Sequence, residues 1–231
     1  MEWASRNACR LATPAYRVHD SGVKGGGVVL LNGTSSAGKG TIAKAIQAEA
    51  GDEAWLHHGI DRMLEGVPAS LSEFVDPGHG RPDGPGWTLP FRDGTMMGAA
   101  RVGALALQVL DGMYRSAAAM ASAGNRVVLD DVIYDPRVLA LAAQALSGTP
   151  TLFVGVRCPV ELAIKREYQR GDRALGGAAA FDPLVHNPGT YDLEVDTSLQ
   201  GPDECARVIL LAFRGVMVGG AVQRAAARNP S

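Results

Sequence analysis

The fold is decided by the stretch Val28-Val29-Leu30-Leu31-Asn32-Gly33-Thr34-Ser35-Ser36-Ala37-Gly38-Lys39-Gly40-Thr41, in which an apolar run leads into a glycine-rich turn. Residues 28–32 have the apolar, β-branched character of a buried parallel strand. Residues 33–38 are the expected turn, and a helix opens at residue 40. This order suits a phosphate-binding loop, because backbone N–H groups and a helix N-terminus both attract anions. Lys39 is expected to bind the β- and γ-phosphates of a nucleotide.

The residue after this lysine departs from the usual pattern. A serine or threonine normally stands there and places its hydroxyl on Mg²⁺, whereas here Gly40 follows Lys39 and Thr41 comes one later. We therefore expect Thr41 to contact phosphate rather than to ligate the metal directly. A glycine-rich turn without a ligand is the alternative. The expected nucleotide-binding residues of the loop are Gly33, Thr34, Ser35, Ser36, Ala37, Gly38, Lys39, Gly40 and Thr41.

Length and composition favour one α/β domain. The 231 residues suffice for a full core, and we expect a kinase domain at 25–220 between a poorly ordered extension, 1–24, and a tail, 221–231. The net charge of −2 and the lack of a Lys/Arg run argue against a nucleic-acid partner. Three widely spaced cysteines predict a cytoplasmic location. Neither a signal peptide nor a membrane span is expected.

A carboxylate follows the second expected strand, residues 55–60. Ligands of open parallel sheets lie outside the carboxyl ends of the strands, so Asp61 is expected to face the same crevice as Lys39. Asp61 is therefore a candidate catalytic and acceptor-binding residue, and a helix cap is the alternative. His57 and His58 lie on the same strand without a third ligand at metal spacing, so packing or exposure is favoured over zinc.

Two acids end the third expected strand, residues 126–131. An apolar strand followed by aspartate is a feature by which phosphoryl-transfer sites bind Mg²⁺ or its waters. Asp130 and Asp131 are thus candidate substrate-binding residues, and Asp130 joins Thr41 as a candidate metal contact, directly or through water. Many turns after strands carry aspartate, so this pattern alone is a weak signal. It indicates a functional site here because the same chain contains the phosphate-binding loop.

Residues 66–95 hold five prolines and many glycines, which predicts no core element. Because this segment precedes a long helix expected at 96–123, we interpret it as an insertion that covers the substrate. Trp87 and Phe91 would then contact the acceptor. A surface loop without that role is the alternative.

Cations gather near a second candidate covering segment, the lid at 165–185. A strand at 151–158 precedes a helix at 161–170, on which Arg166 and Arg170 are four apart, with Arg173 three further on. Guanidinium groups bind phosphate bidentately, so Arg170 and Arg173 are candidate catalytic residues and Arg166 a nucleotide contact. An exposed helix face paired with glutamates is the alternative.

The alternation of elements predicts a five-stranded parallel sheet with helices on both faces. A helix at 135–148 starts with Asp135 as cap and Pro136 in its first turn. The remaining expected elements are a strand at 191–197 and a helix at 202–218. The expected fold class is α/β with three layers. Gly38-Lys39-Gly40-Thr41 resembles the loop of nucleoside monophosphate kinases, and this resemblance implies a P-loop NTPase of that type.

Over residues 27–213 the chain resembles the chloramphenicol phosphotransferase family through Gly33–Thr41, Gly59-Ile60-Asp61, Val128-Leu129-Asp130-Asp131-Val132, Val154-Gly155-Val156-Arg157-Cys158, Arg170-Gly171-Asp172-Arg173 and Tyr191-Asp192-Leu193-Glu194-Val195-Asp196-Thr197. The resemblance implies a nucleotide-kinase-like fold that uses ATP and Mg²⁺ to phosphorylate a primary hydroxyl of chloramphenicol. It also implies that Asp61 is the base that takes the hydroxyl proton.

The chain departs from the family pattern at Gly40 and in the insertion. Because the insertion would form the acceptor pocket, the resemblance supports the phosphate donor better than the acceptor. The expected function is an ATP- or GTP-dependent O-phosphotransferase acting on a hydroxyl of a small antibiotic or related natural product, for inactivation or self-resistance. A kinase for a nucleoside, nucleotide or nucleoside antibiotic is one alternative. A nucleotide-binding regulatory switch without a small acceptor is another. The oligomeric state is left open, a homo-oligomer included.

Overall fold

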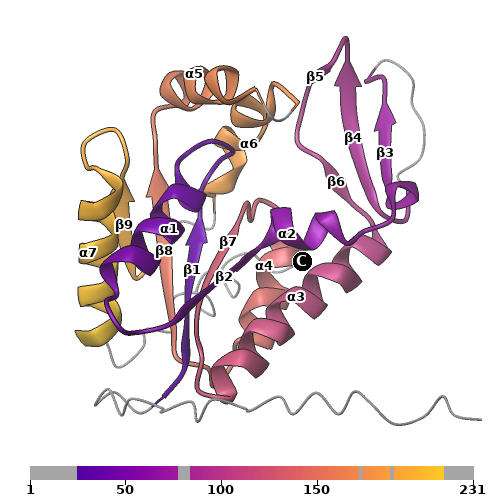
Figure 1. Cartoon of the computed structure of the whole chain (residues 1–231). Coiled ribbons are helices and arrows are strands. Elements are labelled where there is room, and N and C mark those ends of the chain that lie inside the picture. Colours follow the sequence, from indigo (N-terminus) through magenta and orange to yellow (C-terminus); the bar gives the residue numbers. More distant parts are fainter. Residues whose placement is uncertain (1–24, 78–83, 172–173, 188–189, 216–231) are drawn as a thin grey trace, which may run out of the picture.

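The computed structural model describes residues 25–77, 84–171, 174–187 and 190–215 (Figure 1). The expected extension at 1–24, the tail at 221–231 and the last residues of the final helix lie outside this part of the chain. In chain order the elements are β1 (Gly27–Asn32), α1 (Lys39–Glu49), β2 (Trp55–Gly59), α2 (Ile60–Glu65), a 3₁₀ turn (Ala69–Leu71), β3 (Ser72–Val75), β4 (Trp87–Arg92), β5 (Thr95–Met96), β6 (Arg101–Val102), α3 (Ala104–Ser122), β7 (Arg126–Asp131), α4 (Pro136–Ala145), β8 (Thr151–Arg157), α5 (Val160–Arg170), α6 (Gly177–Val185), β9 (Leu193–Asp196) and α7 (Pro202–Gly215).

The large sheet confirms the expected five parallel strands, in the order β2-β7-β1-β8-β9. Helices cover both of its faces (Figure 1). Side chains of β1 alternate between two cores: Val28 and Leu30 join the cluster with α3 and α4, and Val29 and Leu31 join the cluster with α1 and α7. A strand buried on both faces must be apolar throughout, which explains the uninterrupted run in the sequence. The phosphate-loop end of this sheet therefore rests on a rigid scaffold.

A second, smaller sheet corrects the expectation that residues 66–95 hold no core element. Strand β4 pairs with β3, β5 and β6, and Val75 and Trp87 are buried. Prolines do not prevent this pairing, because their carbonyls still accept: Pro90 from Met97 N–H and Pro85 from Leu105 N–H, both at 2.8 Å. The insertion thus packs against the start of α3 and has a defined structure on both sides of residues 78–83.

The helix expected at 96–123 begins only at Ala104, which is a second correction. The eight residues from Met96 on include the end of β5 and all of β6, because this segment pairs antiparallel with β4. Gly103 marks the boundary, since a Cβ there would lie 2.5 Å from the Pro85 carbonyl oxygen. Sheet pairing with a distant segment therefore overrides the local helical spacing.

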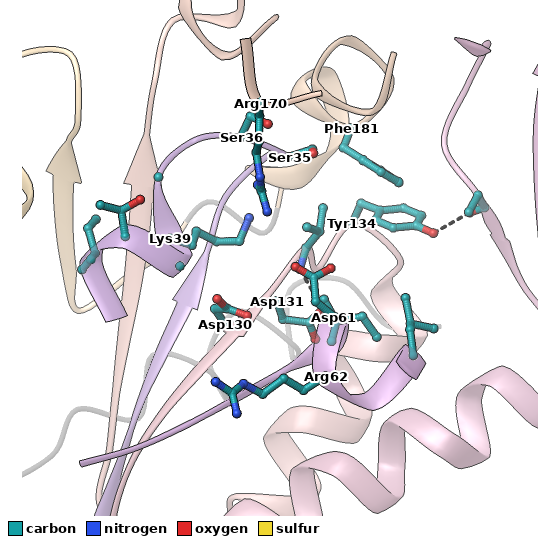
Figure 2. A pocket seen from close by; sticks show the side chains of 18 of the residues that line it. Ser35, Ser36, Lys39, Asp61, Arg62, Asp130, Asp131, Tyr134, Arg170 and Phe181 are labelled. Carbon is teal, nitrogen blue, oxygen red and sulfur yellow. Dashed lines mark hydrogen bonds between the residues drawn. The ribbon is translucent and has the colours of Figure 1, made fainter. Parts of the chain in front are cut away.

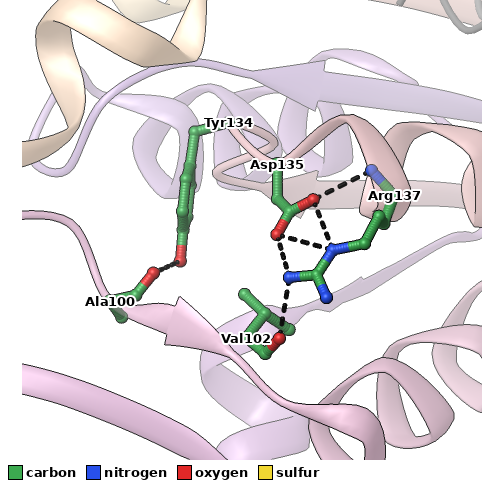
Figure 3. Close-up of polar contacts among 5 residues, drawn as sticks. All are labelled: Ala100, Val102, Tyr134, Asp135 and Arg137. Carbon is green, nitrogen blue, oxygen red and sulfur yellow. Dashed lines mark hydrogen bonds and ion pairs between the residues drawn. The ribbon is translucent and has the colours of Figure 1, made fainter. Parts of the chain in front are cut away.

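The loop between β7 and α4 fastens the small sheet to the large one (Figure 3). Asp135 caps α4 by accepting from Arg137 N–H at 2.9 Å, with Pro136 in the first turn, as expected. The Arg137 guanidinium donates to Val102 O at 2.8 Å, and the Tyr134 hydroxyl donates to Ala100 O at 2.5 Å. These contacts hold the small sheet above one end of the large sheet.

Within the described ranges, none of the helices is both long enough and apolar enough to cross a membrane.

Candidate active site

The loop between β1 and α1 is shaped by two glycines. A Cβ at Gly33 would lie 2.6 Å from the Val156 carbonyl oxygen, and Gly38, the residue before α1, has φ 104°, a left-handed conformation that favours glycine. Lys39 is only 9% exposed, and its Nζ donates to the carbonyls of Gly33 and Thr34, each at 2.8 Å. The lysine therefore lies inside the curve of the loop, where the sequence motif placed it.

Contacts from α5 and from the turn after β9 hold the loop from outside. The Ala37 carbonyl accepts from the Thr197 hydroxyl at 2.8 Å and from Arg166 Nη1 at 3.4 Å. Arg166 also donates to the Thr197 hydroxyl and carbonyl, each at 2.9 Å. Arg166 thus lines the cavity next to the loop, and its described contacts anchor the loop to Thr197.

One cavity of about 930 Å³ runs from the phosphate loop to the small sheet (Figure 2). At one end it is lined by polar and basic residues: Ser35, Ser36, Gly38, Lys39, Gly40, Thr41, Arg166 and Arg170. At the other end it is lined by apolar and aromatic residues, among them Trp87, Leu89, Val102, Leu110, Tyr134 and Phe181. Asp61, Asp130 and Asp131 line it as well. The structure therefore brings most of the sequence-predicted residues to one space.

Asp61 comes from the first turn of α2, one element later than the strand end at which it was expected. The side chain is exposed and points into the cavity (Figure 2). The preceding strand ends at Gly59, where a Cβ would lie 2.6 Å from the Asp130 backbone oxygen and would also meet its carboxylate. Glycine at this position is therefore favoured by Asp130, which lies opposite it in the β2–β7 register.

The two neighbouring acids of β7 have different partners. Asp131 is 3% exposed and accepts from the Tyr114 hydroxyl and from Val132 N–H. Burial raises the pKa of Asp131 to about 6, although both hydrogen bonds act in the opposite direction. Asp130 Oδ2 instead lies 2.9 Å from His57 Nε2. Asp131 is thus tied to the core, and Asp130 is held by a side chain that itself lines the cavity.

Aromatic side chains form the far wall of the cavity. The rings of Tyr134 and Phe181 lie 4.9 Å apart, and Trp87 lines the same space, as expected. Phe91 does not line it, which corrects its assignment as an acceptor contact. This residue lies further out along β4, beyond the part that faces the cavity, and packs edge-on against Phe74 at 5.2 Å. The aromatic wall therefore comes from β4, the loop after β7, and α6.

The candidate lid consists of α5 and α6 in the described chain. Arg170 ends α5 and reaches from above toward Lys39 (Figure 2). Gly171, with φ 64°, terminates this helix after Arg170, and the candidate residue Arg173 lies outside the described part of the chain. Glu167 is buried and accepts from Gly176 N–H at 2.8 Å and Ala178 N–H at 3.0 Å. It caps α6 instead of pairing on the surface.

Sequence reasoning missed several residues of this site: Tyr114, Tyr134, Glu167 and Phe181, and the contact of His57 with Asp130. None of these roles carried a signal in the sequence, because each depends on partners from distant segments of the chain.

The oxygen donors near the loop suit a hard cation held mainly by its nucleotide. Among the residues the structure describes, no group of three or more His, Cys, Asp or Glu side chains could hold a metal ion. Asp130 and Thr41 both line the cavity next to Gly40, which offers no hydroxyl. Mg²⁺ commonly takes one or two protein oxygens and completes its shell with phosphates and water. The donor set therefore fits that ion.

Solved structures with a similar fold include kinases. The Mycobacterium tuberculosis APS kinase CysC, in complex with AMPPNP and APS, matches with a TM-score of 0.57 and 18% identity over 83% of this chain and 99% of that one. Shikimate kinase from Acinetobacter baumannii, in complex with shikimate, gives 0.54 and 14% over 86% and 99%. The Deinococcus radiodurans tunicamycin resistance protein gives 0.51 and 15% over 84% and 98%. These likenesses confirm the expected fold class.

Sequence comparisons agree on the family. A protein of Mycobacterium tuberculosis named "Putative O-phosphotransferase" is 33% identical over 203 residues, which cover 87% of this chain and 88% of that protein. The model of the chloramphenicol phosphotransferase-like proteins matches residues 26–214. The family that the motifs resembled is thereby confirmed, and with it the expected class of enzyme, a phosphotransferase with an alcohol group as acceptor. This chain belongs to the chloramphenicol phosphotransferase-like family.

Proposed function

We propose that this chain uses Mg²⁺ and ATP or GTP to phosphorylate a hydroxyl of a small natural product with an apolar body, antibiotics of the chloramphenicol type included. One observation carries the proposal: a single cavity joins the phosphate loop to an apolar, aromatic compartment, and Asp61 points into it. The acceptor and the triphosphate would therefore meet beside a carboxylate.

The polar end supports a triphosphate. Lys39 and the amides at the start of α1 supply positive charge where the β- and γ-phosphates would lie. Ser36 Oγ is buried and, within the described chain, has no hydrogen-bond partner, so it is available to a phosphate oxygen. Arg170 would approach the same phosphates from the lid and neutralise charge that develops on the equatorial oxygens during transfer.

Asp130 and Thr41 are the residues that would hold Mg²⁺, directly or through water. The ion, when bound, supplies positive charge that offsets the charge on the transferring phosphoryl group. Gly40 adds no ligand of its own, so the nucleotide and water would complete the coordination.

The apolar end supports an acceptor with an aromatic or aliphatic body. Trp87, Tyr134 and Phe181 present ring surface, and Val102 and Leu110 add aliphatic surface. The Tyr134 hydroxyl is already engaged with Ala100 O, so the ring is held in place. Burial of apolar acceptor surface would supply binding free energy, and the polar part of the acceptor would be left facing the phosphates.

Asp61 would serve as the general base. Its carboxylate would orient the acceptor hydroxyl and take its proton as the new oxygen–phosphorus bond forms and the nucleoside diphosphate leaves. A positioned base contributes on the order of 10²- to 10⁴-fold to the rate.

The proposal is tested by an ATP-consumption screen across hydroxylated antibiotics, with mass spectrometry of the products. We expect an acceptor that contains an aromatic or apolar body to gain about 80 Da, the mass of one phosphoryl group. ATP hydrolysis that no acceptor stimulates, together with a partner protein whose affinity follows the bound nucleotide, would instead indicate a regulatory switch. Localisation of the phosphate by fragmentation would show which hydroxyl reacts.

The aromatic pair Tyr134–Phe181 favours one second candidate, a kinase for a nucleoside or nucleoside antibiotic. Two rings 4.9 Å apart at the cavity wall offer a face on which a nucleobase could stack. Inclusion of nucleosides in the same screen distinguishes the two acceptors.

A further inference from the structure

The structure assigns to His57 a positioning role: it holds the Asp130 carboxylate in place of the loop hydroxyl that Gly40 lacks, so that Asp130 receives the metal–nucleotide complex. This inference rests on the proposed function for the presence of that complex. His57 would contact neither nucleotide nor acceptor, and it would act only through Asp130.

The first support is the geometry of the carboxylate. His57 Nε2 lies 2.9 Å from Asp130 Oδ2, and both side chains are nearly buried, at 12% and 11% exposure. They come from adjacent strands, β2 and β7, in a register that places Gly59 opposite Asp130. Because a Cβ at Gly59 would lie 2.6 Å from the Asp130 backbone oxygen and would also meet its carboxylate, glycine at this position leaves room for Asp130 beside β2, where His57 reaches it.

The second support is the space on the other side of the same oxygen. A Cβ built on Gly40 would lie 3.6 Å from Asp130 Oδ2, an ordinary contact distance. In a loop with serine after the lysine, a hydroxyl would therefore stand next to this carboxylate. Here that donor is absent from the loop, and an imidazole approaches the same oxygen from β2 instead.

The neighbouring acid shows that this arrangement is particular to Asp130. Both oxygens of Asp131 are bound within the core, by the Tyr114 hydroxyl and Val132 N–H. The adjacent histidine, His58, contacts Ser116 Oγ at 3.2 Å. Only one acid–histidine pair of this β2–β7 segment thus faces the cavity next to Gly40, where Lys39 and Thr41 also lie.

The proposal is tested by calorimetric titration of the full chain with a non-hydrolysable ATP analogue, with Mg²⁺ and with EDTA. For His57→Leu we expect the affinity gained from Mg²⁺ to fall roughly 10-fold, as for other residues that orient metal ligands, while affinity in EDTA stays unchanged. His57→Gln, which keeps a donor to the carboxylate, should retain most of the gain. His58→Leu is the matched control on the same strand.

A second variant separates positioning from a packing role. Gly40→Ser is made in the parent chain and in the His57→Leu background, because the new hydroxyl could also ligate Mg²⁺ directly. If His57 replaces that hydroxyl beside Asp130 Oδ2, the increase in the Mg²⁺-dependent gain should be larger in the His57→Leu background than in the parent. The proposal is overturned if His57→Leu behaves like His58→Leu, or if its affinities with Mg²⁺ and with EDTA fall equally. It is also overturned if Mg²⁺ gives the parent chain no gain.

No acceptor enters this titration, so its outcome is independent of the acceptor screen. Failure of the screen with an intact Mg²⁺ effect would reject the proposed reaction and leave the role of His57 standing. Phosphoryl transfer in the screen, together with an unchanged Mg²⁺-dependent gain in affinity for His57→Leu, would support the proposed reaction and reject the role of His57.

Discussion

The two ends of the cavity are built in different ways. Most of the phosphate end, the polar end of the cavity that is proposed to bind the triphosphate, comes from one continuous segment, residues 33–41, which follows a strand buried on both faces. Helix α5 adds Arg166 and Arg170. The acceptor end, the apolar end of the cavity where the acceptor is proposed to bind, is assembled from β4, β6, α3, the loop after β7, and α6. A local motif can therefore specify the first, while the second depends on how distant segments pack. This difference explains why a short sequence motif predicts the binding of a nucleotide but does not predict the acceptor.

Removal of the loop cation should have the largest effect. Lys39→Ala is expected to lower phosphoryl transfer about 10³-fold, because the developing phosphate charge loses its buried cation. Steady-state kinetics and nucleotide titration measure this effect. Arg207→Ala, an exposed cation on α7 that pairs with Glu49, serves as the control and should match the parent. Equal rates for Lys39→Ala and the control would remove the loop from the reaction.

Asp61→Asn tests the junction between the two ends. We expect kcat to fall at least about 10²-fold with nucleotide affinity nearly unchanged, because the amide cannot take the hydroxyl proton. Asp52→Asn, in the exposed turn before β2, is the charge-matched control. A parallel loss of nucleotide affinity would make Asp61 part of the phosphate end, and an unchanged kcat would exclude it as the base.

The acceptor end should respond through KM. Phe181→Ala is expected to raise the acceptor KM about 10-fold, the loss expected from part of one buried ring, and to leave nucleotide affinity unchanged. Phe91→Ala provides a matched aromatic truncation, since Phe91 packs against Phe74 outside the cavity. Equal changes in the acceptor KM for the two variants would mean that the aromatic wall does not contact the acceptor.

The smallest effect concerns stability and pH. Burial raises the pKa of Asp131 from 3.8 to about 6, so the folded chain binds more protons than the unfolded chain between these values. Stability from this group is present below about pH 4 and is lost as pH rises through 6. Asp131→Asn should therefore match the parent near pH 4 and exceed its free energy of unfolding by about 1–3 kcal/mol at pH 8.

Urea unfolding at several pH values measures this difference. A constant offset between Asp131→Asn and the parent would mean that the carboxyl does not titrate in this range. Tyr114→Phe is the informative companion variant. Loss of its hydroxyl donor should raise the pKa of Asp131 further, so the stability contributed by this group should be lost at a higher pH than in the parent.

Much of the scaffold could be predicted from sequence. The loop, the five parallel strands and the cap at Asp135 are specified by neighbours in the chain, and the structure bears them out. Residues 96–103 were mistaken for helix because their strand partner, β4, lies elsewhere in the sequence. Trp87 and Phe91 looked equivalent, and only the packing of the small sheet separates them.

The acids show the same limit at the level of single residues. Asp130 and Asp131 are adjacent, and both were expected to bind substrate, with Asp130 also a candidate metal contact. Their roles diverge because His57 comes from β2 and Tyr114 from α3, and no local pattern indicates either partner. Sequence therefore locates the carboxylates, and tertiary contacts determine what each can do.

The central claim is that triphosphate and acceptor meet at Asp61 within one cavity. A crystal structure with Mg²⁺ and a non-hydrolysable ATP analogue tests this most directly. We predict the β- and γ-phosphates on the amides of residues 33–40 and on Lys39, with the γ-phosphate facing Asp61 and the aromatic compartment beyond it. Phosphates bound elsewhere, or a γ-phosphate separated from Asp61 by protein, would contradict the account.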